Sequence, residues 1–176
     1  VRELSVLLAY EATNDLQTDK VTVETPMGQA TGERLRGTIG LVPILRAGLG
    51  MVEGFSEMMP DAVVWHIGLK RDDRTLEPMH YYANKPLEPD VQTGVILDPM
   101  LATGGSASAA CDLLKSWGVG HIRFVGLIAA PEGIERLHVD HPEVPIYLAG
   151  LDAHLNEDGF IVPGLGDAGD RQFGTA

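Results

Sequence analysis

Five apolar runs of strand length constrain the fold of this chain more than any other feature. They cover residues 38–45, 62–69, 94–98, 122–129 and 146–149. The runs read as buried strands, and helical stretches fall between several of them. Alternating buried strands and helices predict an α/β fold, a parallel β-sheet flanked by helices on both faces. In such a sheet, ligands are expected beyond the carboxyl ends of the strands.

The N-terminal part of the chain is predicted to be peripheral to this core. Leu4, Leu7 and Leu8 recur at helical spacing within residues 2–12, which predicts a helix. K-V-T-V-E-T at 20–25 precedes a P-M-G-Q turn and a polar return, which together predict a β-hairpin arm. The chain opens without Met, so we expect a further segment upstream of it.

Length and composition limit the classes of protein to which the chain can belong. Its 176 residues, 44% of them hydrophobic, suffice for one core, so residues 1–176 are expected to form a single domain. The net charge of −12 disfavours nucleic acid as a partner, because that affinity depends on Lys and Arg neutralising phosphates. The apolar stretches at 38–52 and 122–131 are interrupted and too short for a bilayer span, so no membrane partner is expected.

The number of cysteines indicates the redox state of the cellular compartment in which the protein works. Cys111 is the only cysteine, so the chain can form neither an internal disulfide nor a zinc site of clustered cysteines. This usage fits a reducing compartment, and we expect the cytoplasm. Cys111 lies inside a predicted helix, where we interpret it as a small core residue rather than a nucleophile.

The strongest functional signal is V-I-L-D-P-M-L-A-T-G-G-S at 95–106. A buried strand there ends in an acid and runs through a Thr-Gly-Gly-Ser turn into a helix. The glycines let main-chain amides approach an anion closely, and the Thr and Ser hydroxyls add donors. The free amides and positive dipole end of the helix point at whatever the turn holds. The pattern predicts a site for a phosphate monoester.

Asp98 stands at the strand tip, within a sugar's reach of that phosphate. Its carboxylate can accept hydrogen bonds from vicinal hydroxyls, so the arrangement suits a ribose 5-phosphate. A simpler interpretation stays open, because any α/β protein needs strand-to-helix turns capped by Ser or Thr. An ATP-binding P-loop is excluded, since the lysine of G-x-x-x-x-G-K-[ST] is missing.

Residues 70–93 form an unusually long connection, rich in charge and proline and without periodicity. Two interpretations are equally open. The segment is either a lid that keeps water from a reactive intermediate or a surface excursion without a role.

Six blocks of sequence carry a resemblance to a known family. They are L-L-A-Y-E-A-T (7–13), V-P-I-L-R-A-G-L-G-M (42–51), T-L-E-P (75–78), D-P-M-L-A-T-G-G-S (98–106), A-A-P-E-G (129–133) and V-P-G-L-G-D-A-G-D-R (162–171). Together they resemble the uracil phosphoribosyltransferase family over essentially the whole chain. The resemblance implies a type I phosphoribosyltransferase core with a C-terminal hood, residues 150–176, that binds the base. It also implies the activity, conversion of uracil and 5-phospho-α-D-ribose 1-diphosphate (PRPP) to UMP and diphosphate.

The resemblance also implies which residues form the site. Those implied to bind PRPP are Arg46, Arg71, Asp98, Pro99, Met100, Leu101, Ala102, Thr103, Gly104, Gly105, Ser106 and Asp167. Those implied to bind uracil are Ile161, Gly166, Asp167 and Ala168. Asp167 and Arg71 are the residues we assign to catalysis, with Asp167 as the candidate general base. Arg46 also follows a buried strand and precedes A-G-L-G, so its guanidinium and nearby amides can converge on diphosphate oxygens; a surface salt bridge is the alternative.

The sequence also leads to expectations about the cofactor and the partners of the protein. We predict no metal site made by the protein, so Mg²⁺ is expected to arrive with PRPP. The resemblance implies a homodimer or higher homo-oligomer and GTP as an activator. Two alternatives stay open: a non-catalytic regulator of the same fold that senses PRPP or a nucleotide, and a phosphoribosyltransferase for another base.

Overall fold

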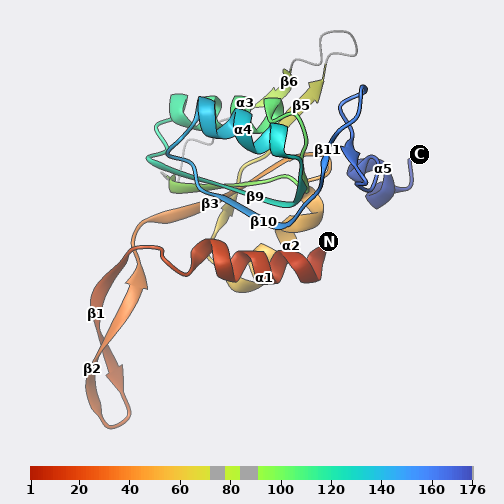
Figure 1. Ribbon diagram of the computed structural model, residues 1–176. Coiled ribbons are helices and arrows are strands. Elements are labelled where there is room, and N and C mark those ends of the chain that lie inside the picture. The colour runs from red at the N-terminus through yellow and green to blue at the C-terminus, as the bar shows by residue number, and fades with distance from the viewer. Residues whose placement is uncertain (72–77, 84–90, 176) are drawn as a thin grey trace.

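The computed structural model describes residues 1–71, 78–83 and 91–175, with side-chain detail excepted at 70–71 and 78–81. Its centre is a sheet with the strand order β10-β9-β7-β3-β5-β6 (Figure 1). Neighbours on this path run parallel, except β6, which is antiparallel to β5. The strands are β3 (Thr38–Leu45), β5 (Ile67–Arg71), β6 (Pro78–Ala83), β7 (Val91–Leu97), β9 (His121–Ala129) and β10 (Ile146–Leu151). Short strands β4 (Val63–Val64) and β8 (Met100–Leu101) pair with β3 and β9.

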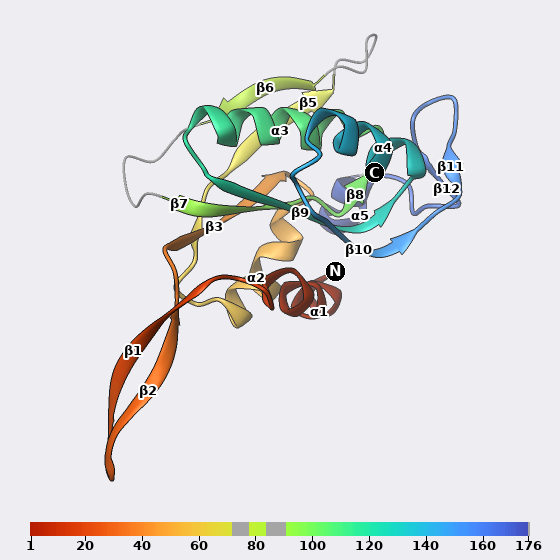
Figure 2. The ribbon, with the colours of Figure 1, turned by 60° about the vertical axis from the view of Figure 1, so that its left-hand side comes forward.

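Helices cover both faces of this sheet, as Figures 1 and 2 show. They are α1 (Arg2–Thr13) and α2 (Leu49–Met58) on one face, and α3 (Gly105–Ser116) and α4 (Pro131–Asp140) on the other. Successive side chains of a strand enter opposite interfaces. Leu41 belongs to the buried cluster beside α1 and α2, and Val42 to the cluster beside α3 and α4. Burial on both faces explains why these strands are continuous apolar runs in the sequence.

β3 and β7 lie side by side in the middle of the sheet, and the chain leaves them in opposite directions. From β3 it continues through α2 to β4 and β5, and from β7 it continues through α3 to β9 on the other side. The loops that follow Leu45 and Leu97 therefore diverge. Such a reversal opens a crevice beyond the carboxyl ends of the strands, where α/β proteins bind ligands.

Two parts of the chain lie outside these layers. β1 (Thr18–Thr25) and β2 (Gly28–Leu35) form an antiparallel hairpin, almost wholly exposed, that projects from the body (Figures 1 and 2). At the other end of the chain, β11 (His154–Leu155), β12 (Ile161–Val162) and α5 (Ala168–Phe173) follow β10. These C-terminal elements border the crevice.

The predicted α/β fold, with a parallel sheet flanked by helices and a β-hairpin arm, is confirmed. Each of the apolar runs contains a strand, and the run at 62–69 is divided between β4 and β5. No helix in the described part of the chain has both the length and the apolar character needed to cross a membrane.

The connection predicted at 70–93 was wrong in part. Residues 78–83 form the edge strand β6, and β7 already begins at Val91. The sequence did not predict this strand because it begins with Pro78, and proline usually argues against a strand. Proline is nevertheless tolerated at the first residue of a strand and on a sheet edge. The lid interpretation itself concerns 72–77 and 84–90, which fall outside the described residues.

Gly48, the N-cap of α2, has no room for a side chain. A Cβ there would lie 2.2 Å from the carbonyl oxygen of Leu97 and 2.7 Å from the backbone nitrogen of Ile44. We predict that Gly48→Ala forces β3 and β7 apart and lowers the free energy of unfolding by about 1–3 kcal/mol, the usual cost of overpacking. Urea unfolding measures this.

Gly120→Ala is the matched control, because a Cβ at Gly120 meets its nearest neighbour, the Gln92 carbonyl oxygen, at 3.8 Å. Its free energy of unfolding should stay within about 0.5 kcal/mol of the parent value. Equal stability of the two variants would contradict the prediction for Gly48.

Candidate functional site

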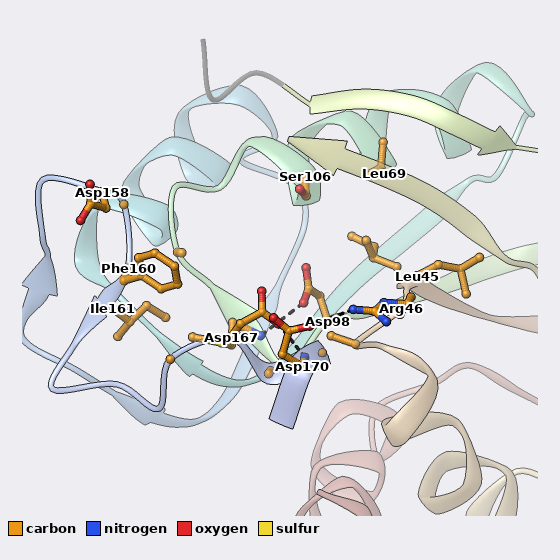
Figure 3. Close-up of a pocket in the computed structure, with 18 residues that line it drawn as sticks. Leu45, Arg46, Leu69, Asp98, Ser106, Asp158, Phe160, Ile161, Asp167 and Asp170 are labelled. Carbon is orange, nitrogen blue, oxygen red and sulfur yellow. Dashed lines mark hydrogen bonds and ion pairs between the residues drawn. The ribbon is translucent and has the colours of Figure 1, made fainter. Parts of the chain in front are cut away.

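A cavity of about 640 Å³ opens at the carboxyl edge of the sheet. Four segments far apart in the sequence line it, together with Leu69 of β5. The lining residues are Ile44, Leu45, Arg46, Ala47, Leu69, Asp98, Met100, Ala102, Ser106, Asp158, Gly159, Phe160, Ile161, Gly166, Asp167, Ala168, Gly169 and Asp170. Figure 3 shows the hood side chains Phe160 and Ile161 on the side of the cavity away from Arg46, with Asp98 between them.

The loop after β7 is held rigidly by the edge of the sheet. The Asp98 backbone nitrogen donates to the Val125 carbonyl oxygen at 3.1 Å, and the Pro99 carbonyl oxygen accepts from Leu127 and Ile128 of β9. The half-buried Asp98 carboxylate accepts a hydrogen bond from the Met100 backbone nitrogen at 3.3 Å. The loop thus presents this carboxylate at a fixed place on the cavity wall.

Gly104 ends the loop and caps α3. Its φ of +79° lies in the left-handed region that favours glycine, and no side chain caps the helix. The first bond inside the helix runs from the Ser108 nitrogen to the Gly104 carbonyl oxygen at 2.9 Å. The amides of residues 105–107 therefore have no partner within the helix, and Ser106 faces the cavity. This arrangement can hold a phosphate.

Arg46 lies on the cavity wall after β3, and its peptide bond with Leu45 is cis. Its Nη2 pairs with Asp170 Oδ1 at 3.1 Å and donates to Thr175 Oγ1 at 3.4 Å. The guanidinium also lies 5.8 Å from the centre of the Phe173 ring. All three partners belong to the C-terminal segment, so Arg46 joins the sheet edge to α5.

The hood supplies the remaining wall. Ile161 is 2% exposed, and Gly166 has a φ of +75°. Asp167 is the N-cap of α5, and its Oδ1 accepts from the Asp170 backbone nitrogen at 2.8 Å. Gln172 of α5 donates to the Ala47 carbonyl oxygen at 3.1 Å, which fastens the helix to the loop after β3.

The structure brings most of the residues singled out in the sequence to one place. The lining contains Arg46, Asp98, Met100, Ala102, Ser106, Ile161, Gly166, Asp167 and Ala168. The other loop positions, Pro99, Leu101, Thr103, Gly104 and Gly105, shape the backbone between them and are not among the lining residues. Arg71 ends β5, but its side chain lies outside the described part of the structure.

Sequence reasoning gave no role to several lining residues. Asp170 is the most consequential, because it pairs with Arg46. The signal was weak, since a second acid three residues after the helix cap is common in any first helical turn. Phe160 and Asp158 also line the cavity; the sequence placed both in the hood but gave neither an individual role.

Acidic groups dominate the described lining. Asp98, Asp158, Asp167 and Asp170 face the cavity, and Arg46 is the cation among the lining residues that the structure describes. Within the same described part, no three potential ligand side chains gather as a metal site. A polyanion therefore enters this cavity more readily with a cation of its own, and carboxylate oxygens match the ligand preference of Mg²⁺.

Cys111 takes no part in this site. Its side chain is fully buried in α3, and burial raises the pKa of the thiol to about 12. Cys111 is therefore a neutral thiol near pH 7. It is unreactive there, because the thiolate is the reactive form. Its interpretation as a core residue is confirmed.

The fold is that of the phosphoribosyltransferases. The structure of an orotate phosphoribosyltransferase from Aeropyrum pernix superposes with a TM-score of 0.54 at 14% identity, over 85% of this chain and 70% of that chain. A solved structure of a protein from Aquifex aeolicus superposes with a TM-score of 0.91 at 41% identity, over 99% of this chain and 84% of that chain.

Sequence comparison narrows this class to one family. The family model for uracil phosphoribosyltransferase matches residues 1–175. The uracil phosphoribosyltransferase of Roseiflexus sp. (strain RS-1) is 58% identical over 175 residues, 99% of this chain and 84% of that protein. That of Acholeplasma laidlawii is 56% identical, again over 99% of this chain and 84% of the relative. The chain belongs to the uracil phosphoribosyltransferase family.

Proposed function

We propose that the protein transfers the 5-phosphoribosyl group of PRPP to N1 of uracil, giving UMP and diphosphate. One observation carries the proposal: in a member of this family, an anion-binding helix N-terminus, Arg46 and the hood converge on one cavity. At about 640 Å³ the cavity is within the usual size of small-molecule sites.

The loop after β7 binds the phosphoribosyl part of PRPP in this proposal. The amides at the start of α3 and the Ser106 hydroxyl donate to the 5-phosphate, and the helix dipole favours its charge. Asp98 accepts hydrogen bonds from the ribose hydroxyls. Support comes from the fixed position of the Asp98 carboxylate and from the uncapped start of α3.

The opposite end of the cavity receives the diphosphate. Arg46 contributes guanidinium donors there, and we propose that Arg71 joins it. The carboxylates on the wall suit a Mg²⁺ ion that arrives with PRPP, and bound Mg²⁺ supplies charge neutralisation of the diphosphate. The residues of the chain have to orient the diphosphate so that its departure lies in line with the base.

The hood reads uracil through its main chain. Uracil alternates carbonyl acceptors with an N–H donor, and backbone groups near Ile161, Gly166 and Ala168 can match this alternation. Fixed main-chain groups suit this task because they need no side-chain ordering. The burial of Ile161 and the capped start of α5 support a rigid reading surface.

The chemistry follows from this placement. The bond between ribose C1 and the diphosphate oxygen breaks, the bond between C1 and uracil N1 forms, and N1 loses its proton. Positive charge builds on the ribose ring as the diphosphate leaves, so positioning and electrostatic stabilisation dominate. Asp167 is the proposed acceptor of the N1 proton, because its carboxylate lines the cavity on the hood side.

We also propose a homodimer or higher homo-oligomer, GTP activation and a cytoplasmic location. Exposed apolar side chains on α1 and the hairpin, Leu7 and Met27 among them, support association with further copies. A second cavity of about 530 Å³ is lined in part by Arg36 and Arg123, and in the GTP proposal a phosphate displaces their carboxylate partners, Asp19 and Asp15. The single buried cysteine supports a reducing compartment.

The direct test is formation of UMP from labelled uracil, PRPP and Mg²⁺. We predict turnover, and we predict that Asp98→Asn and Arg46→Ala each lower kcat/KM for PRPP about 10–100-fold, the value of a charge-assisted hydrogen bond or two. Cytosine, hypoxanthine and orotate in excess should leave the rate unchanged. A protein that binds PRPP but forms no UMP would be a sensor, and inhibition by one of the other bases would indicate a different specificity.

Asp167 caps α5 and is also the proposed general base, so its test needs a variant that changes only the second role. Asp167→Asn keeps the side-chain oxygen that caps α5 but removes the negative charge. We predict an unchanged Tm and a kcat lowered about 100-fold or more at saturating substrates, as expected for loss of a general base. Glu157→Gln, a change at an exposed acid outside the cavity lining, serves as control. A kcat within twofold of the parent would remove Asp167 from the chemistry.

A further inference from the structure

The segment A-A-P-E-G at 129–133 contacts both the hood and the loop after β7, residues 98–104, which is the proposed phosphate loop. It begins at the end of β9 and forms the first turn of α4. Ala130, the N-cap, is fully buried, and its backbone nitrogen donates to the Leu101 carbonyl oxygen at 3.0 Å. The first turn of α4 is therefore attached to the loop that carries Asp98.

On the loop side, contact is between backbones. A Cβ at Gly133 would lie 2.3 Å from the Ala102 carbonyl oxygen and 2.7 Å from that of Leu101. In return, a Cβ at Gly104 would lie 2.8 Å from the Gly133 carbonyl oxygen. Glycine at both positions lets α4 rest directly on the phosphate loop.

On the hood side, the contact is a side chain. Glu132 Oε1 accepts a hydrogen bond from the Leu155 backbone nitrogen at 3.0 Å, and this donor lowers the pKa of the Glu132 carboxyl. Leu155 of β11 is paired with Ile161 of β12. The next residues of the same hairpin towards its tip, 158–160, line the cavity.

Apolar packing continues this connection. Ala102, Ala130 and Ile161 form a small buried cluster, with Met100 and Leu155 packed against it. Its members come from the phosphate loop, α4 and the hood. Ile161 belongs to the hairpin and Ala102 to the phosphate loop. Displacing the hairpin therefore moves Ile161 relative to the loop and disturbs the cluster that the two residues share.

Asp152 provides a second attachment at the base of the hairpin. Its Oδ2 accepts from the Gly164 backbone nitrogen at 3.0 Å, and its own backbone nitrogen donates to the Ala129 carbonyl oxygen at 2.8 Å. The hairpin is thus fixed at its base by Asp152 and along β11 by Glu132.

We propose that Glu132 is a positioning residue for the base: its carboxylate fixes β11 and β12 so that Ile161 faces uracil in register with the phosphate loop that Gly133 supports. The inference rests on the proposed function, since it assigns the hood to uracil. Glu132 lies outside the cavity lining, so it acts on uracil affinity through the position of the hairpin.

The test compares Glu132→Ala, Glu132→Gln and Glu135→Ala. Glu132→Ala should raise KM for uracil about tenfold, the effect of losing one hydrogen bond that positions the site, with KM for PRPP and kcat within about twofold. Glu132→Gln should restore KM for uracil, because its amide oxygen accepts from the same N–H. Glu135, exposed on the same helix, should leave all three constants unchanged when replaced by Ala.

Hydrogen exchange at the Leu155 amide gives a readout that does not need turnover. It should accelerate in Glu132→Ala and not in Glu135→Ala, whether or not UMP is formed. Accelerated exchange with an unchanged KM for uracil would overturn the positioning role, and so would an equal rise in the KM of both substrates. Absence of UMP formation by the parent protein would count against the proposed function and leave the exchange result to judge the attachment.

If Glu132→Ala fails to fold, Asp152→Asn tests the same hairpin from its base. It keeps an acceptor for the Gly164 nitrogen, so KM for uracil should stay near the parent value, while Asp152→Ala should raise it about tenfold. Equal KM values for uracil in these two variants would overturn the premise of the proposal, that attachment of this hairpin positions the base.

Discussion

The proposed phosphate site depends on one interaction, the approach of main-chain amides to an anion at the start of α3. That approach requires Gly104 in a left-handed conformation, an N-cap without a side chain, and a glycine at 133 against which the loop can lie. A helix end of this kind offers donors and a favourable dipole without any lysine or arginine. The proposed phosphate site is therefore compatible with a chain whose net charge is −12.

The two walls of the cavity differ in how they are held. The first part of the phosphate loop, from Asp98 to Leu101, is paired with β9, so the sheet fixes Asp98. The hood is fastened at separate points instead: Asp170 with Arg46, Gln172 with the Ala47 carbonyl oxygen, and Glu132 with Leu155. If the proposed sites are correct, the sugar-phosphate site is built on the sheet and the base site on individually attached segments, so the base site can change while the fold stays the same.

The sequence was sufficient where a property is local. Strands buried on both faces appear in the sequence as continuous apolar runs. The Thr-Gly-Gly-Ser sequence at 103–106 predicts a glycine-containing turn before a helix. It was insufficient where a property depends on distant residues. Arg46 and Asp170 are 124 positions apart, and Glu132 meets Leu155 across 23, so no spacing rule identifies either contact. The base-binding role proposed for the hood rests on family resemblance. The edge strand β6 was missed because it begins with a proline.

Titration with ribose 5-phosphate, followed by amide chemical shifts, would show whether the main chain at the start of α3 binds a phosphate. The ligand carries the phosphate and the sugar hydroxyls but neither diphosphate nor base. If main-chain amides at the start of α3 bind the phosphate, the largest shifts will fall on residues 104–107, and Gly104→Ala will abolish them. Unchanged shifts at 104–107, with the ligand bound elsewhere on the protein, would show that the start of α3 is not the phosphate site.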